Sequence, residues 1–136
     1  MTTDIDVNTE MENHAKAAIE MVLAEYDHTL DLSEPSIGDI AAILNALWQS
    51  QDISDEFIES AALLFGSYIG ETIRHNFTLA SWNKTCSEPA FLRINGVDHF
   101  PTEWCYRQLK NGPADSVIDQ YIAFREAVHN ARGSAT

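Results

Sequence analysis

The sequence predicts an α+β fold: three N-terminal helices, a small antiparallel sheet of two or three strands, and two C-terminal helices. Apolar residues recur at helical spacing before residue 76 and again after residue 101. Between these regions lie short, aromatic-rich segments bounded by turn-forming residues, which are typical of strands. The length of 136 residues suits one domain. We expect a single globular domain over residues 9–131, with a flexible N-terminus (1–8) and a flexible tail (132–136).

The first 76 residues contain the signals of three helices. Thr9 and Glu12 match a capping box, so the first helix is expected to begin at Thr9 and to continue to about Leu30. A turn that ends at Pro35 leads into the second helix, and Ser54 caps the third. The third helix has apolar residues at Phe57, Ile58, Ala61, Leu64, Phe65, Tyr68, Ile69, Thr72 and Ile73. Because this stripe covers more than half of its circumference, we expect this helix to be central, with neighbours on two sides.

The sheet is expected after the third helix. Residues 77–82 and 90–94 are partly alternating and read as strands. Asn95-Gly96 is a tight-turn signal that leads into a possible third strand over residues 97–100.

Two helices are expected to complete the fold. Pro101 suits the first position of a helix that continues over residues 102–111 and ends at Gly112. The final helix is expected from about Ala114 to about Ala131.

The net charge of −13 is confined to one part of the chain. Residues 1–60 contain 14 acids and one base, Lys16, whereas residues 61–136 contain seven of each. This field disfavours binding to nucleic acid or to anionic lipid, and it favours basic partners. A solvated surface that keeps the protein soluble is the alternative interpretation.

Targeting and redox signals point to a cytoplasmic protein that does not enter a membrane. The acidic N-terminus lacks the basic region and apolar run of a secretory signal. The uncharged run of residues 60–70 is far shorter than a membrane span of about 20 residues. Cys86 and Cys105 do not make a disulfide framework, so we expect reduced thiols.

Catalytic and metal-binding patterns are weak. Glu71 and His75 are four residues apart on one predicted helix, but a metal site needs three or four ligands. Ser67 lies inside a helical pattern and not at the strand-to-helix turn of a nucleophile elbow. We therefore expect no enzymatic activity, no metal and no cofactor.

Gly66 and Gly70 are the most informative residues of the third helix. Glycine inside a helix costs about 0.5–1 kcal/mol relative to alanine, so two on one face indicate close approach of another backbone or of a ligand. We expect Gly70 to let the strand that carries Trp82 lie against this helix.

Five side chains near these glycines are the candidate binding residues. Glu71 is expected to form an internal ion pair with Arg107 or Arg74. The functional alternative is a small cleft lined by Tyr68, Glu71, Arg74 and Trp82, where a small molecule would bind.

Part of the chain resembles a group of small bacterial proteins of uncharacterised function. The shared residues are Gly66, Tyr68, Gly70, Glu71, Arg74 and Trp82, followed by Pro101, the run from Arg107 to Gly112, and Asp115-Ser116. The resemblance covers roughly residues 64–121. It implies a fold of helices with a small sheet, in cytosolic domains of which some bind partners or neutralise toxins.

We therefore expect a non-enzymatic bacterial interaction domain whose acidic helical surface binds a basic protein partner, as an immunity or toxin-neutralising protein would. A small-molecule binding domain with a pocket near the Gly66–Gly70 helix and Trp82 is the first alternative. A structural or oligomeric subunit is the second.

Overall fold

The computed structural model describes residues 6–50, 52–85 and 89–134, and over them it confirms the predicted α+β fold. The elements, in chain order, are α1 (Val7–Tyr26), α2 (Ser36–Ser50), α3 (Asp55–Asn76), β1 (Ser81–Asn83), β2 (Phe91–Ile94), β3 (Val97–His99), α4 (Pro101–Asn111), the 3₁₀ helix η1 (Gly112–Asp115) and α5 (Val117–Ser134).

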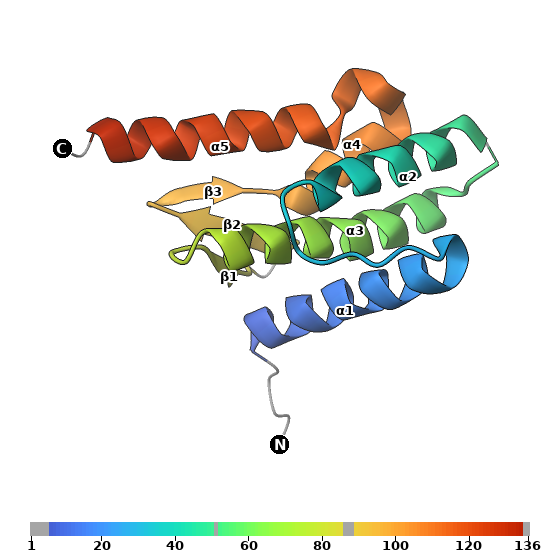
Figure 1. Ribbon diagram of the computed structural model, residues 1–136, viewed down its shortest axis with the longest axis horizontal. Coiled ribbons are helices and arrows are strands. Elements are labelled where there is room, and N and C mark those ends of the chain that lie inside the picture. Colours follow the sequence, from blue (N-terminus) through green and yellow to red (C-terminus); the bar gives the residue numbers. More distant parts are fainter. Residues whose placement is uncertain (1–5, 51, 86–88, 135–136) are drawn as a thin grey trace.

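Helix α3 is central, as its wide apolar stripe predicts. Its most extensive contacts are with α1 on one side and α4 on the other, while α2 packs on α4 and α5 (Figure 1). The sheet lies beside the C-terminal part of α3, with β1 against α1. Its strands are antiparallel in the order β1-β2-β3, and Trp82 pairs with Leu92.

The third strand exists, and the turn before it has the predicted geometry. Asn95 and Gly96 both have positive φ, 54° and 77°, as a tight turn between twisted strands requires. The first strand is shorter than expected because residues 77–80 form a turn. The Phe77 N–H donates to the Ile73 carbonyl at the end of α3, and the Ala80 N–H donates to the Phe77 carbonyl.

The limits of α1 differ from the prediction. The helix begins at Val7, because the Asp6 carbonyl accepts the Glu10 N–H and the Asn8 side chain accepts the Trp82 N–H of β1. Thr9 therefore lies inside the helix, and the predicted capping box is wrong. The helix ends at Tyr26, four residues before Leu30.

The other helix ends follow local signals more closely. Ser54 caps α3 by accepting the Phe57 N–H at 3.1 Å, as predicted. Pro101 begins α4, and Gly112, with φ of 77°, ends it. Helix α5 begins at Val117, after η1, and continues to Ser134, past the predicted end. Residues 1–5 and 135–136 of the predicted flexible ends lie outside the described residues.

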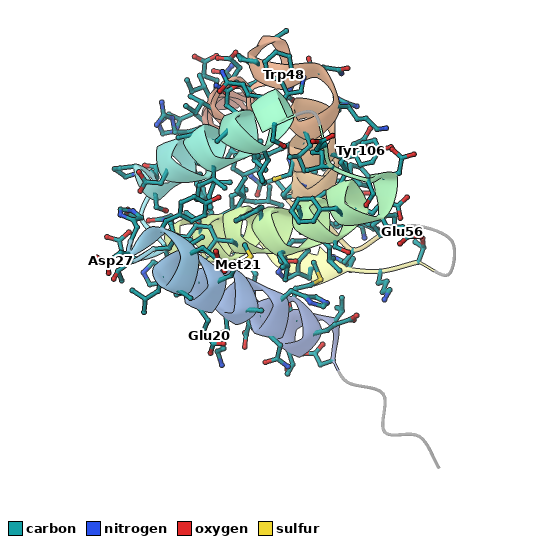
Figure 2. All side chains as sticks on the ribbon, turned by 90° about the vertical axis from the view of Figure 1, so that its right-hand side faces the viewer. Glu20, Met21, Asp27, Trp48, Glu56 and Tyr106 are labelled. Carbon is teal, nitrogen blue, oxygen red and sulfur yellow. The ribbon has the colours of Figure 1, made fainter. Side chains whose placement is uncertain are left out.

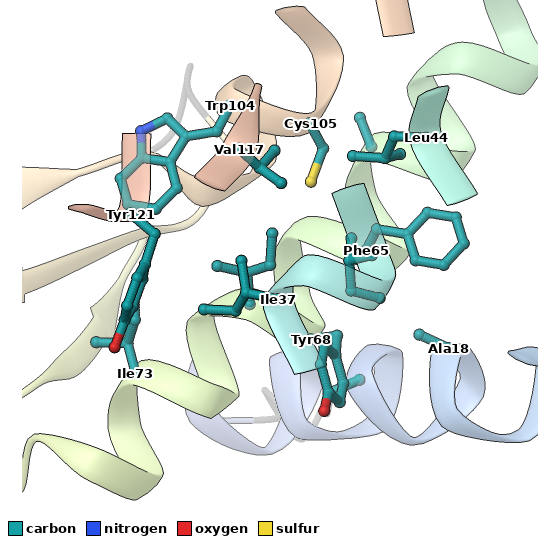
Figure 3. Packing of buried hydrophobic residues seen from close by; sticks show 14 of the residues in the cluster. Ala18, Ile37, Leu44, Phe65, Tyr68, Ile73, Trp104, Cys105, Val117 and Tyr121 are labelled. Carbon is teal, nitrogen blue, oxygen red and sulfur yellow. The ribbon is translucent and has the colours of Figure 1, made fainter. Parts of the chain in front are cut away.

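One hydrophobic core joins all five helices. Ala18 of α1, Ile37 of α2, Phe65 of α3, Cys105 of α4 and Val117 of α5 converge in it (Figure 3). Burial raises the pKa of the Cys105 thiol far above its ordinary range, so this cysteine is an apolar packing residue and not a nucleophile. Cys86 lies outside the described residues.

A single buried amide ties three helices together. Gln108 of α4 is 2% exposed, and its Nε2 donates to the Ala41 carbonyl of α2 at 2.9 Å. Its Oε1 accepts the Val117 N–H, the first of α5, also at 2.9 Å. Both polar ends of the side chain are thus satisfied in the core.

Candidate functional site

The two glycines of α3 are sites of close packing. A Cβ at Gly70 would lie 2.1 Å from Cζ2 of Trp82, and a Cβ at Gly66 would lie 2.4 Å from Cα of Thr102. The indole of β1 and the backbone of α4 therefore occupy the space that the glycines leave. We call this contact of Gly66 and Gly70 with Thr102 and Trp82 the glycine seam. The predicted approach of the Trp82 strand to Gly70 is confirmed.

Glu71 is the polar centre beside this seam. Its Oε2 accepts a hydrogen bond from Nε1 of Trp82 and another from Nη1 of Arg74, each at 2.8 Å. Its side chain is 13% exposed. Arg74 also reaches Glu12 of α1 at 3.3 Å. Partial burial works against the charge of Arg74, but the hydrogen bonds and negative charges of Glu71 and Glu12 outweigh it and raise the pKa of the guanidinium.

Of the two predicted partners of Glu71, only Arg74 meets it. Arg107 lies on the exposed face of α4, where its Nη2 donates to Glu103 one turn earlier at 2.7 Å. The reason is geometric: an i,i+3 pair needs only the helix itself, whereas a pair with Arg107 needs the two helices to turn those faces together.

Tyr68 is fully buried, and its hydroxyl makes its hydrogen bonds away from Glu71, with Leu32 and Ser36. Its hydroxyl accepts the Leu32 N–H at 2.8 Å and forms a 2.7 Å hydrogen bond with Oγ of Ser36. Tyr68 therefore fixes the connection between α1 and α2. The hollow of about 230 Å³ beside Glu71 and Arg74 is lined by neither Tyr68 nor Trp82.

The acids among residues 6–50 and 52–60, which the structure describes, fall into two groups. Glu10, Glu12, Glu34 and Asp55 form ion pairs with Lys or Arg side chains. Asp39 forms a hydrogen bond with His28, and Asp31 accepts hydrogen bonds from Ser33. No ion pair or side-chain hydrogen bond within the described part of the chain involves Asp6, Glu20, Glu25, Asp27, Asp52, Glu56 or Glu59. All seven of these are exposed.

Six of these unpaired acids belong to one end of the molecule. The C-terminal end of α1 and the start of α3 lie at the same end of the fold (Figure 1), and Figure 2 views that end with Glu20, Asp27 and Glu56 labelled. We call this surface the acidic end; its carboxylates are Glu20, Glu25, Asp27, Asp52, Glu56 and Glu59. Its helices also expose apolar side chains, with Leu23, Tyr26 and Phe57 at 50%, 47% and 44%. Phe57 thus lies outside the core, unlike the rest of the predicted apolar stripe.

Two of these acids lie where helix electrostatics opposes them. Glu25 is in the last turn of α1, Asp27 is its C-cap residue, and that turn has no basic residue. The C-terminus of a helix carries partial negative charge and favours cations. By contrast, Glu56 is in the first turn of α3, where negative charge is favoured. Helix stability therefore does not explain the acids at the end of α1.

The chain matches no family model, no curated protein and no solved structure. No helix among the described residues combines the length and apolar composition that a bilayer span requires. Nor does the described part of the chain bring together three His, Cys, Asp or Glu side chains in a group that could hold a metal ion.

Proposed function

We propose that this protein is a non-enzymatic bacterial interaction domain, acting in the cytoplasm, whose acidic end binds a basic protein partner. An immunity or toxin-neutralising role suits that activity. The observation that carries the proposal is the set of unpaired, exposed carboxylates at one end of the fold, including two where the helix dipole opposes them.

The composition of the acidic end supports protein binding over simple solubility. Unpaired carboxylates accelerate encounter with a basic surface and reject acidic ones. The exposed Leu23, Tyr26 and Phe57 supply apolar area of the kind that stabilises an interface once the partners meet. Solubility alone needs the charges but not these side chains.

Capture of partners from the native host tests the proposal. The bait proteins are the wild type, the variant Glu20→Lys/Glu25→Lys, and the control Asp119→Lys/Glu126→Lys on exposed positions of α5. Both variants change the net charge by the same amount, so they separate a specific surface from overall charge. The expected result is a basic protein that the wild type and the control retain and the α1 variant loses.

Salt gives a second readout on the same complex. Binding through the acidic end should weaken steeply as the salt concentration rises from 0.05 M to about 0.5 M, because exposed charges are screened. Retention by both double variants, an acidic partner, or binding that is insensitive to salt would each count against the proposal.

A further inference from the structure

Next to the acidic end, α3 and α4 form an open groove of about 700 Å³. Ala62 and Leu63 of α3 line one side, and Phe100 and Tyr106 line the other. Glu56 and Tyr106 lie on the same side of the molecule in the end view (Figure 2), and Glu59 lines the groove, so the groove opens beside the α3 carboxylates of the acidic end.

The packing of the two helices explains the groove. The Gly66–Thr102 contact lies toward one end of the α3–α4 interface, where the backbones touch. From there the groove follows α3 toward its N-terminus and α4 toward its C-terminus. An ion pair of 2.9 Å between Asp55 and Lys110 connects the helices beyond it.

The charged side chains that line the groove, among the described residues, are all acidic. The ionisable lining includes Glu59 and Glu103, and no Lys, Arg or His among the described residues lines the groove. Glu59 forms no ion pair with a described residue, although the nearby charge of Lys110 acts on it, and the Glu103 carboxylate pairs with Arg107 of its own helix at 2.7 Å. An apolar floor with carboxylates at its sides complements a side chain with an apolar stem and a cationic head. The Tyr106 ring already has a cation beside it, because the Lys110 ammonium lies 5.8 Å from its centroid.

The openness of the groove decides between a small molecule and a protein segment. Small-molecule sites bury about 70–90% of their ligand, whereas this groove is more open to solvent than such a site. A helix laid along the groove buries its apolar face and leaves its charged flanks beside the carboxylates.

We propose that the α3–α4 groove binds a cationic amphipathic helix of the basic partner. An apolar side chain of that helix packs on Leu63 and Tyr106, and lysine or arginine side chains meet Glu59 and Glu103. This inference rests on the proposed function, because it names the segment of the partner that is recognised.

A model peptide tests the groove without the native partner. The probe is a fluorescent 14-residue helical peptide of leucine and lysine; its counterpart carries glutamate at every lysine position. Fluorescence anisotropy with the full chain should show binding of the lysine peptide only. Substitution Glu59→Gln/Glu103→Gln should raise its Kd about fivefold or more, and Glu20→Gln/Glu25→Gln by less than about twofold.

A second variant and its matched control test the apolar residues of the groove. Leu63→Ala/Tyr106→Ala should weaken the lysine peptide about fivefold or more, whereas Leu23→Ala/Tyr26→Ala, on α1, should change its Kd less than about twofold. The glutamine variants replace exposed carboxylates, so they keep the test decisive if the alanine variant unfolds.

The outcomes separate the two proposals. Three results would contradict the proposal that the groove binds a cationic helix. They are equal weakening of peptide binding by the groove and α1 variants, binding of the glutamate peptide, and no binding of the lysine peptide. None of these changes the result of the partner-capture experiment, on which the proposed function depends. Retention of the native partner by the groove variants would also overturn this inference while leaving the acidic end intact.

Discussion

The glycine seam and the acidic end both contain features that weaken a helix, but only in the seam does the rest of the fold compensate. At the seam, two glycines admit the Trp82 indole and the α4 backbone, and Glu71 receives hydrogen bonds from Trp82 and Arg74. At the acidic end, Glu25 and Asp27 oppose the dipole of α1 and have no partner in the described chain. The comparison teaches that a residue that weakens a helix indicates a binding surface only where no other part of the fold contacts its side chain.

The largest effect is expected at the seam. Gly66→Ala places a Cβ 2.4 Å from a backbone atom of α4, so the helices must separate, and we expect the free energy of unfolding to fall by about 3 kcal/mol. Gly38→Ala is the control, because nothing lies within 4 Å of its Cβ, and it should stabilise by about 0.5 kcal/mol. Urea denaturation measures both. Similar values for the two variants would mean that the seam is not tightly packed.

Glu71→Ala is expected to be the next most severe. It leaves the nearly buried indole N–H of Trp82 unpaired and removes the closer partner of Arg74, so stability should fall by about 2 kcal/mol. Glu103→Ala removes an exposed pair with Arg107 and should cost less than about 0.5 kcal/mol. If both substitutions cost the same in urea denaturation, Glu71 is not a structural tie.

At the acidic end, a substitution should raise the free energy of unfolding instead of lowering it. Glu25→Lys puts a cation in the last turn of α1 and should stabilise the protein by about 0.3–1 kcal/mol at low salt. Glu10→Lys makes the same change in the first turn, where it also removes the pair with Lys84, and should destabilise by a similar amount. The difference between the two variants in thermal unfolding should shrink in 1 M salt. A loss of stability in Glu25→Lys would show that this acid serves the fold.

The smallest effect concerns pH. Burial against α5 lowers the pKa of His99, and the negative charge of Asp98 only partly offsets this lowering. Below about pH 6.5, His99 therefore takes up a proton more readily in the unfolded chain than in the folded chain. The free energy of unfolding should thus be highest above this pH and decline as the pH falls. The fall in unfolding free energy between pH 7.5 and 5 should be shallower in His99→Gln. If the pH dependence of the unfolding free energy is the same in His99→Gln as in the wild type, His99 is not its source.

The fold was predictable where the signal is local. Ser54, Asn95-Gly96, Pro101 and Gly112 each impose a backbone geometry that depends on few neighbours, and each acts as predicted. The capping box at Thr9 failed because the docking of Asn8 on β1 extends α1 backward. A tertiary contact thus replaced the local signal.

The candidate site was less predictable because its members meet across the fold. The contact of Gly70 with the Trp82 strand followed from the cost of glycine in a helix. The hydrogen bond of Tyr68 to the Leu32 backbone and the exposure of Phe57 depend on how the α1–α2 connection and the start of α3 are placed. No periodicity contains that information. The spacing of Glu71 and Arg74 did carry a signal for their ion pair.

The Gln108 amide has a consequence for the way the molecule opens. The N–H of Val117 stands at the start of α5, where helix amides ordinarily face solvent and exchange hydrogen quickly. Because it donates to a side chain buried between α2 and α4, it is released only when α5 leaves the core. Deuterium exchange at this one amide should therefore follow the separation of three helices. It provides a built-in reporter of cooperative unfolding.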